Sequence, residues 1–433
     1  MKIWPQALEM AAQTPDERNR YVDFLRAVSI LVVVTGHWLI AALHYQDGTL
    51  TPGDLLAIRP GTQWLTWVFQ VMPIFFIVGG YANAVSLEAA HRREIGYAGW
   101  LVTRLSRLVS PLLVLLLAWA ALAAILHYSG VSGDVLRFAS RASLIPIWFL
   151  AIYIMVVVLA PATYLAWKRW GFVSFWAFAI VGALVDIAFF SAKQQWLGWT
   201  NYFWVWLAVH HLGYAWRDGR MGSPARLLIY SALGLSILVL LVNKGPYPFA
   251  MAGSPDAGLS NTLPPKITLL ALGVFQFGLL LSVETPMRRL LSGLKLWAAT
   301  VLINSMIMTL YLWHLTVMVI IVALFYLAGG LGLGLKPGSS EWWMSRPVWI
   351  AVLYAGLLPV TFLFAPFERR SRPPDAPVPT ATQLISGALL ICVGVALLAL
   401  FGIGRPPLPG LDFAAFAMVL VGSGFCGLLP GFK

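Results

Sequence analysis

The chain has 433 residues, of which 60% are hydrophobic and only 11% are charged, and its mean hydropathy is +0.80. Soluble globular proteins contain roughly 45–50% apolar and about 25% charged residues, so this composition argues against a water-soluble fold. The net charge of +12 does not indicate nucleic acid as a partner, because the basic residues occupy short connections between apolar runs and form no basic face. The sequence predicts an all-α, polytopic transmembrane helical bundle.

Apolar runs of about 18–25 residues, each long enough to cross a hydrocarbon core of about 30 Å, recur along almost the whole chain. The first run begins only near Tyr21, after a segment of mixed charge, so we expect no cleaved signal peptide. The twelve predicted spans are 22–44, 63–87, 105–127, 145–166, 172–190, 199–216, 226–243, 266–283, 297–329, 347–366, 384–403 and 412–430.

The lysines and arginines set the expected orientation. With both the N-terminus and the C-terminus in the cytoplasm, most basic residues face that side, as the positive-inside rule requires. We therefore expect a multi-pass protein of the inner (plasma) membrane, in contact with membrane lipids. The predicted parts are a cytoplasmic N-terminal segment at 1–21, a ten-span core at 22–371, a Pro-rich cytoplasmic linker at 372–383, and an accessory two-helix segment at 384–433.

The longest outer connection, at residues 244–266, is rich in Pro and Gly but also carries Tyr247, Phe249 and Met251. Loops of this length in compact proteins are often lids or binding loops. The two cysteines, Cys392 and Cys426, lie in separate apolar runs without metal-site or redox spacing, and we expect no bound metal and no permanently bound cofactor.

Ionisable side chains inside spans are the informative ones, because each costs at least about 2.5 kcal/mol at the bilayer centre. In the first span Arg26 and His37 are eleven residues apart, which places them on one helix face and roughly 16 Å apart along the axis. An imidazole suits proton transfer near neutral pH. The alternatives are an arginine that snorkels to the interface and a histidine that hydrogen-bonds a neighbouring helix.

Further short elements follow this Arg-x10-His element, which Asp23 precedes. They read MPIFFIVGGYAN at 72–83, RLSRLVSP at 104–111, PIWFLAIYIMVVVLAP at 146–161, MTLYLWH at 308–314 and FERR at 367–370. In order and spacing these elements resemble the membrane-bound acyltransferase family 3. The resemblance covers about residues 20–370 and leaves the last two predicted spans outside. Gly79 stands where the family usually has serine, which excludes a serine nucleophile there.

The resemblance implies an O-acyltransferase that takes acyl-CoA, with acetyl-CoA as the favoured donor, from the cytoplasm. The acceptor would be a hydroxyl of an envelope glycan, a glycolipid or a secondary metabolite at the outer face. The rival interpretation is a transporter or flippase for an envelope lipid or small molecule, which would also use buried polar groups. Transporters often show paired interrupted helices in repeated halves, and no such pair is apparent in the sequence.

Within the acyltransferase interpretation, Arg104 and Arg107 lie three residues apart on one helix face and suit the phosphates of CoA, with Arg26 at similar depth. His37 would act as the base or become transiently acylated. His314 is expected at nearly the same depth and would orient the acceptor or share the proton. For the arginine pair the alternative is a purely topological role, and for His314 it is a satisfied interior histidine.

Four further polar residues could donate hydrogen bonds to a thioester oxygen or to acceptor hydroxyls, or could instead bridge helices. They are Asn83, Gln276, Asn304 and Tyr311. Asp186, in the outer half of the fifth predicted span, is expected to pair with a histidine.

Overall fold

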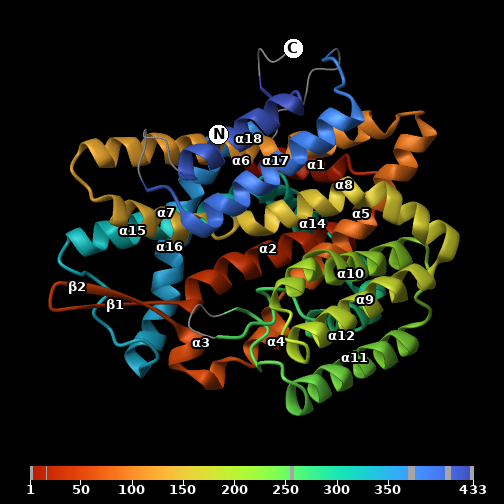
Figure 1. The fold of residues 1–433 in the computed structure, drawn as a ribbon, viewed down its shortest axis with the longest axis horizontal. Coiled ribbons are helices and arrows are strands. Elements are labelled where there is room, and N and C mark those ends of the chain that lie inside the picture. Colours follow the sequence, from red (N-terminus) through yellow and green to blue (C-terminus); the bar gives the residue numbers. More distant parts are fainter. Residues whose placement is uncertain (1–2, 16, 254–257, 369–375, 405–410, 430–433) are drawn as a thin grey trace.

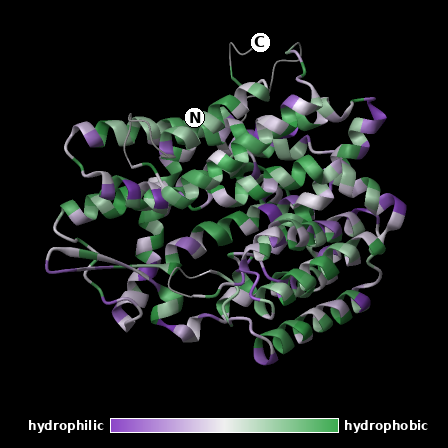
Figure 2. Cartoon of the chain, in the orientation of Figure 1, coloured by the Kyte–Doolittle hydropathy of each residue, from purple (hydrophilic) through white to green (hydrophobic). Residues whose placement is uncertain are grey.

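The computed structural model describes residues 3–15, 17–253, 258–368, 376–404 and 411–429, and it is 77% helical. Its helices lie side by side across the view of Figure 1, and one small β-hairpin projects from the bundle. Hydrophobic residues cover most of the helices, whereas hydrophilic residues gather at helix ends and at a few interior positions (Figure 2). The prediction of an all-α polytopic bundle is confirmed.

Nine helical segments in the described part of the chain are long and apolar enough to cross a membrane. They are α2 (Arg20–Ile40), the run Pro60–Arg92 formed by η1 (Pro60–Thr62), α4 (Leu65–Phe69) and α5 (Met72–Arg92), α6 (Tyr97–Tyr128), α8 (Ile147–Trp170), α9 (Phe172–Phe190), α11 (Pro224–Lys244), α15 (Ile307–Leu327), α16 (Ser340–Glu368) and α17 (Ala381–Phe401). A tenth candidate is the pair α12 (Ile267–Ser282) and α13 (Glu284–Leu290), which is bent by 55°.

The other helices are shorter than a span. They are α1 (Ile3–Ala12), α3 (Leu55–Ile58), α7 (Gly133–Leu144), η2 (Gln195–Thr200), α10 (Asn201–Arg217), α14 (Leu294–Asn304) and α18 (Leu411–Phe425). The predicted spans at 199–216 and 412–430 correspond to α10 and α18, which have 17 and 15 residues. The predicted linker at 372–383 and the FERR element at 367–370 fall partly outside the described residues.

The first predicted span ends earlier than its apolar run suggests. Helix α2 stops at Ile40, and the chain continues into an antiparallel hairpin of β1 (Ala41–Gln46) and β2 (Thr49–Asp54). Asp47 and Gly48 connect the strands with φ angles of 50° and 81°, the left-handed conformation that a tight Asp-Gly hairpin turn requires.

The apolar run at 297–329 is not one helix either. It divides into α14 and α15 at Ser305 and Met306. The Glu368 carboxylate, from the end of α16, accepts hydrogen bonds from the backbone N–H groups of Met308 and Thr309, at 3.0 and 2.9 Å. Because the first N–H groups of a helix have no partner within the helix, this carboxylate stabilises a new helix start in the middle of the run.

Helix α10 lies in the interior and packs most closely on α5. Gly213 of α10 and Gly80 of α5 face each other so tightly that a Cβ on either would collide with the backbone of the other helix. Small residues at such crossings allow the close approach that stabilises helix pairs in membranes. The two ends of the chain are also packed, since α1 contacts α14 through Ala7 and Trp297, and the α17–α18 pair lies against α8.

Candidate functional site

Two histidines from opposite ends of the sequence meet inside the bundle. His37, near the end of α2, and His314, two turns into α15, have Nδ1 and Nε2 respectively 2.9 Å apart. Their rings stack with centroids 5.1 Å apart. His314 is fully buried, whereas His37 keeps accessible surface. The pair therefore presents one histidine to any bound molecule and hides the other.

The hydrogen bonds of the pair fix which nitrogen carries each proton. His314 Nδ1 lies 2.6 Å from the carbonyl oxygen of Tyr311, which can only accept, so His314 carries its proton on Nδ1. Neutral His314 Nε2 is then an acceptor, and His37 Nδ1–H donates to it. It follows that His37 Nε2 carries the free lone pair, and no described side chain pairs with it.

Neighbouring side chains hold the pair in place. The indole Nε1–H of Trp38 donates to the His314 carbonyl oxygen at 3.0 Å. One turn away, the hydroxyls of Thr35 and Tyr354 are 2.8 Å apart and join α2 to α16. A Cβ added at Gly36 would meet nothing within 4 Å, so no other element packs on α2 at Gly36, the residue before His37.

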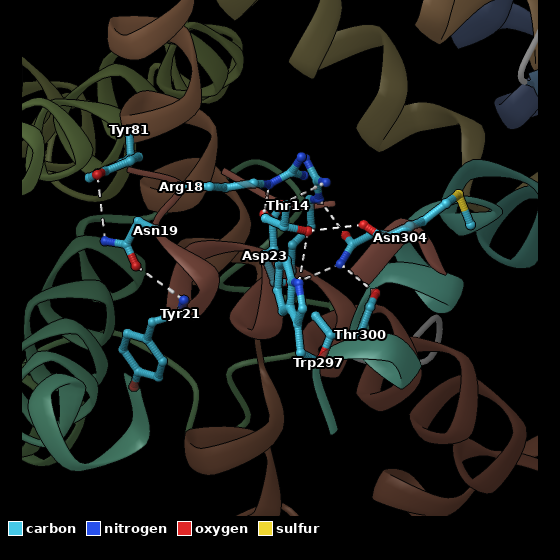
Figure 3. A network of polar contacts seen from close by, with 11 residues as sticks. Thr14, Arg18, Asn19, Tyr21, Asp23, Tyr81, Trp297, Thr300 and Asn304 are labelled. Carbon is cyan, nitrogen blue, oxygen red and sulfur yellow. Dashed lines mark hydrogen bonds and ion pairs between the residues drawn. The ribbon is translucent and has the colours of Figure 1, made fainter. Parts of the chain in front are cut away.

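A second polar network lies at the start of α2, three turns from His37. Asp23 accepts from Arg18 Nε at 2.6 Å and from Arg26 Nη2 at 3.2 Å. Arg26 Nε also donates to the Asn304 side-chain oxygen at 2.7 Å, and the Asn304 amide donates to the Asp23 and Thr300 carbonyl oxygens (Figure 3). These contacts hold the Arg26 guanidinium in one orientation.

Arg104 and Arg107 on α6 bring further positive charge to this region. Arg104 is close enough to Arg26 and Arg107 to interact electrostatically with both, and its Nη2 donates a long hydrogen bond of 3.4 Å to the Ala82 carbonyl oxygen. Among the described residues, no carboxylate lies within ion-pair distance of Arg104 or Arg107. Three neighbouring guanidinium groups with a single carboxylate between them suit an anionic ligand.

Residues 19–366 match the family model of an acyltransferase domain, acyltransferase family 3. The chain belongs to this family. No curated protein and no solved structure matches it. The matched range of the family-3 domain contains the histidine pair and Arg26, Arg104 and Arg107, whereas Arg18 precedes it and α17 and α18 follow it.

The side chains of three of the supporting polar residues predicted for this family-3 domain form hydrogen bonds away from the histidine pair and the arginines. The Asn83 amide lies 3.1 Å from His210 Nε2 and joins α5 to α10. The Gln276 amide donates to the Trp67, Val68 and Gln70 carbonyl oxygens at the end of α4. The Tyr311 hydroxyl donates to the Pro146 carbonyl oxygen at 2.7 Å. The Tyr311 backbone, and not its hydroxyl, contacts the histidine pair.

The expectation that Asp186 pairs with a histidine is wrong. Its carboxylate accepts from the Asn201 amide at 2.9 Å, the Tyr247 hydroxyl at 3.1 Å and the Ile267 N–H at 2.8 Å. Lys266, fully buried with its ammonium 3.4 Å from the centre of the Phe189 ring, lies nearby. Asp186 therefore fastens both ends of the 244–266 connection to the bundle.

The middle of this connection is fastened to the segment before α5. Trp67 Nε1–H donates to the Phe249 carbonyl oxygen at 2.8 Å, and the Met251 N–H donates to the Thr66 hydroxyl at 2.8 Å. The described part of the connection is thus held by specific hydrogen bonds on two sides. It forms a fixed cover over α4, α9 and α12.

Sequence reasoning missed two residues of the polar networks, Arg18 and Tyr354. Arg18 lies in the segment of mixed charge before the first apolar run and ion-pairs with Asp23. Tyr354 sits in an apolar helix where a single tyrosine gives no distinct signal. Within the described residues, no group of three or more His, Cys, Asp or Glu side chains is placed to hold a metal ion.

Proposed function

We propose that this family-3 acyltransferase moves an acyl group from cytoplasmic acyl-CoA, with acetyl-CoA as the favoured donor, to a hydroxyl at the outer face of the inner membrane. The acceptor class is a glycan, a glycolipid or a secondary metabolite. The observation that carries the proposal is the contact of His37 Nδ1 with His314 Nε2, which leaves the Nε2 lone pair of neutral His37 free to act as a base. A nitrogen base with a fixed tautomer is what hydroxyl activation requires.

The reaction follows from that tautomer. His37 Nε2 removes the proton from the acceptor hydroxyl as its oxygen attacks the thioester carbonyl carbon, which forms the new C–O bond. The tetrahedral intermediate then expels the CoA thiolate, which takes the proton from His37 Nε2. The hydrogen bond to the Tyr311 carbonyl keeps the Nδ1 proton of His314 in place, so that His314 Nε2 continues to accept from His37 Nδ1–H. His314 orients His37 and stabilises the transient imidazolium.

Donor binding is assigned to the arginines. Arg26, Arg104 and Arg107 would bind the CoA phosphates, and Asp23 with Asn304 would position Arg26. The eleven residues between Arg26 and His37 span roughly 16 Å of helix, a distance that the pantetheine arm has to cover to bring the thioester to the base. The support for this division is that the two networks lie at different levels of the same helix, α2.

Oriented proteoliposomes test the proposal. The protein is reconstituted and radiolabelled acetyl-CoA is sealed on one side of the membrane at a time, with an envelope extract as acceptor on either side. We expect labelled product only when acetyl-CoA has access to the face that carries Arg104 and Arg107 and the acceptor is on the other face. Equal labelling with the donor on either face would contradict this arrangement.

A further inference from the structure

Gly79 and Tyr153 share one small volume between α5 and α8. A Cβ added at Gly79 would lie 2.9 Å from Cε2 and 3.0 Å from the hydroxyl oxygen of Tyr153, closer than real Cβ contacts. Tyr153 therefore occupies the space that any side chain at position 79 would need. At position 79 of α5 this chain therefore has the hydroxyl of a tyrosine from α8 in place of a side chain of its own.

The Tyr153 side chain lies within electrostatic range of two arginines, Arg104 and Arg26. Arg104 also contacts the carbonyl of Ala82, one turn along α5 from Gly79. Two guanidinium groups favour an orientation in which the hydroxyl oxygen faces them and its proton points away. The hydroxyl is thereby set to donate a hydrogen bond.

The described part of the chain supplies no acceptor for that proton. Among the described residues the Tyr153 hydroxyl has no hydrogen-bond partner. Tyr153 is only partly buried, so a bound molecule can reach it. By contrast the neighbouring Tyr97 and Tyr311 hydroxyls both donate to backbone carbonyls. Inside a membrane protein a free hydroxyl donor carries a cost, so an accessible one near Arg104 and Arg26 indicates a ligand acceptor.

A row of aromatic rings connects this hydroxyl to the histidine pair. The Tyr153 ring stacks on Phe149 at 5.9 Å, Phe149 meets Tyr311 at 5.9 Å, and Tyr311 meets His314 at 6.1 Å. Tyr153 thus lies at the arginine end of the row, and the histidines lie at the other end. A group bound at Tyr153 is part of the donor between its phosphates and its thioester.

We infer that Tyr153, whose ring and hydroxyl fill the space beside Gly79, binds the pantetheine arm of acyl-CoA by donating its hydroxyl proton to an amide carbonyl of that arm. This inference rests on the proposed function. It assigns to Tyr153 a role in donor binding and not in proton transfer, since the hydrogen bond is made equally in the ground state and the transition state.

Titration calorimetry with two probes tests the assignment on full-length protein in nanodiscs. Acetyl-CoA contains the pantetheine arm, whereas adenosine 3′,5′-bisphosphate keeps only the nucleotide end. For Tyr153→Phe we expect the Kd of acetyl-CoA to rise about five- to ten-fold and the Kd of the bisphosphate to stay unchanged. Gly79→Ala, which pushes the Tyr153 ring aside, should show the same selective loss. Tyr230→Phe, on the exposed face of α11, is the matched control.

Two outcomes would overturn the role of Tyr153. One is an unchanged Kd of acetyl-CoA for Tyr153→Phe. The other is an equal rise in the Kd of both probes, which would indicate a distorted structure. A wild-type protein that binds neither probe would contradict the proposed function itself, and this inference with it. A rise in the Kd of acetyl-CoA but not of the bisphosphate, in both variants, supports the assignment.

Discussion

His37 Nδ1 lies 2.9 Å from His314 Nε2, although 277 residues separate the two in the sequence. The contact links the end of α2 to the start of α15 and sets the protonation of both rings through the Tyr311 carbonyl. In the proposed mechanism this contact prepares His37 as the base and His314 as the group that orients it.

Replacing His314 tests the orienting role. We expect His314→Ala to lower the rate of acyl transfer by about 10²-fold, because His37 Nδ1 loses its acceptor and the tautomer with a free Nε2 is no longer enforced. The Kd of acetyl-CoA should remain unchanged. His211→Ala removes a histidine that is equally buried but bonds within its own helix, and it serves as the control. Equal loss of activity in both variants would assign His314 a packing role only.

Neutralising the α6 arginines tests donor binding. We expect Arg104→Gln with Arg107→Gln to raise the Kd of acetyl-CoA by at least about ten-fold, because charge-assisted phosphate contacts are lost. The ratio between variant and wild type should shrink at high salt, where exposed charges are screened. Arg92→Gln with Arg93→Gln removes two exposed charges at the C-terminal end of α5 and should leave binding unchanged. A Kd within two-fold of wild type would show that Arg104 and Arg107 do not bind the donor and serve only to set membrane topology.

Asn304 is expected to act through Arg26. Asn304→Ala removes the acceptor that holds Arg26 Nε at 2.7 Å, so the guanidinium gains freedom and acetyl-CoA binding weakens about five-fold. Asn243→Ala, on α11, removes an exposed amide that bonds only within its own helix. Calorimetric titration of both variants decides the point. Identical affinities would show that Arg26 needs no support from α14.

The anchoring of the outer connection is testable through Asp186. Asp186→Ala leaves the Asn201 amide, the Tyr247 hydroxyl and the Lys266 ammonium without their acceptor or counter-charge, at a cost of roughly 3 kcal/mol in the free energy of unfolding. We expect trypsin to cleave after Lys266 in the variant but not in the wild type, where that side chain is fully buried. Intact-mass spectrometry detects this cleavage. Protection of Lys266 in the variant would contradict the anchoring role.

Helical periodicity predicted most of the membrane helices and the depth of the two site histidines. Apolar runs predicted the membrane helices, and counting turns placed His37 and His314 at a common depth, where the structure brings them into contact. Periodicity failed where a distant residue decides the local structure. The break between α14 and α15 depends on Glu368, which reaches Met308 from 60 residues away.

Hydrogen-bond partners were the least predictable part of the site. The spacing of polar residues shows which helix face they occupy, but a partner depends on which helix lies opposite. Asn83 therefore proved to contact His210, and Asp186 proved to hold the outer connection. Asp47-Gly48 is a typical hairpin-turn dipeptide. The hairpin was not predicted, because the apolar residues of β1 continue the apolar pattern of α2.

The central claim is that His37 Nε2 is the base for acyl transfer, and one measurement tests it most directly. Transfer from radiolabelled acetyl-CoA to envelope acceptor is measured with purified His37→Gln protein, while calorimetry on the same sample records acetyl-CoA binding. His91→Gln, at the exposed end of α5, is the control. We predict that His37→Gln binds acetyl-CoA with wild-type affinity and transfers at least about 10³-fold more slowly. Transfer within a few-fold of the wild-type rate would contradict the claim.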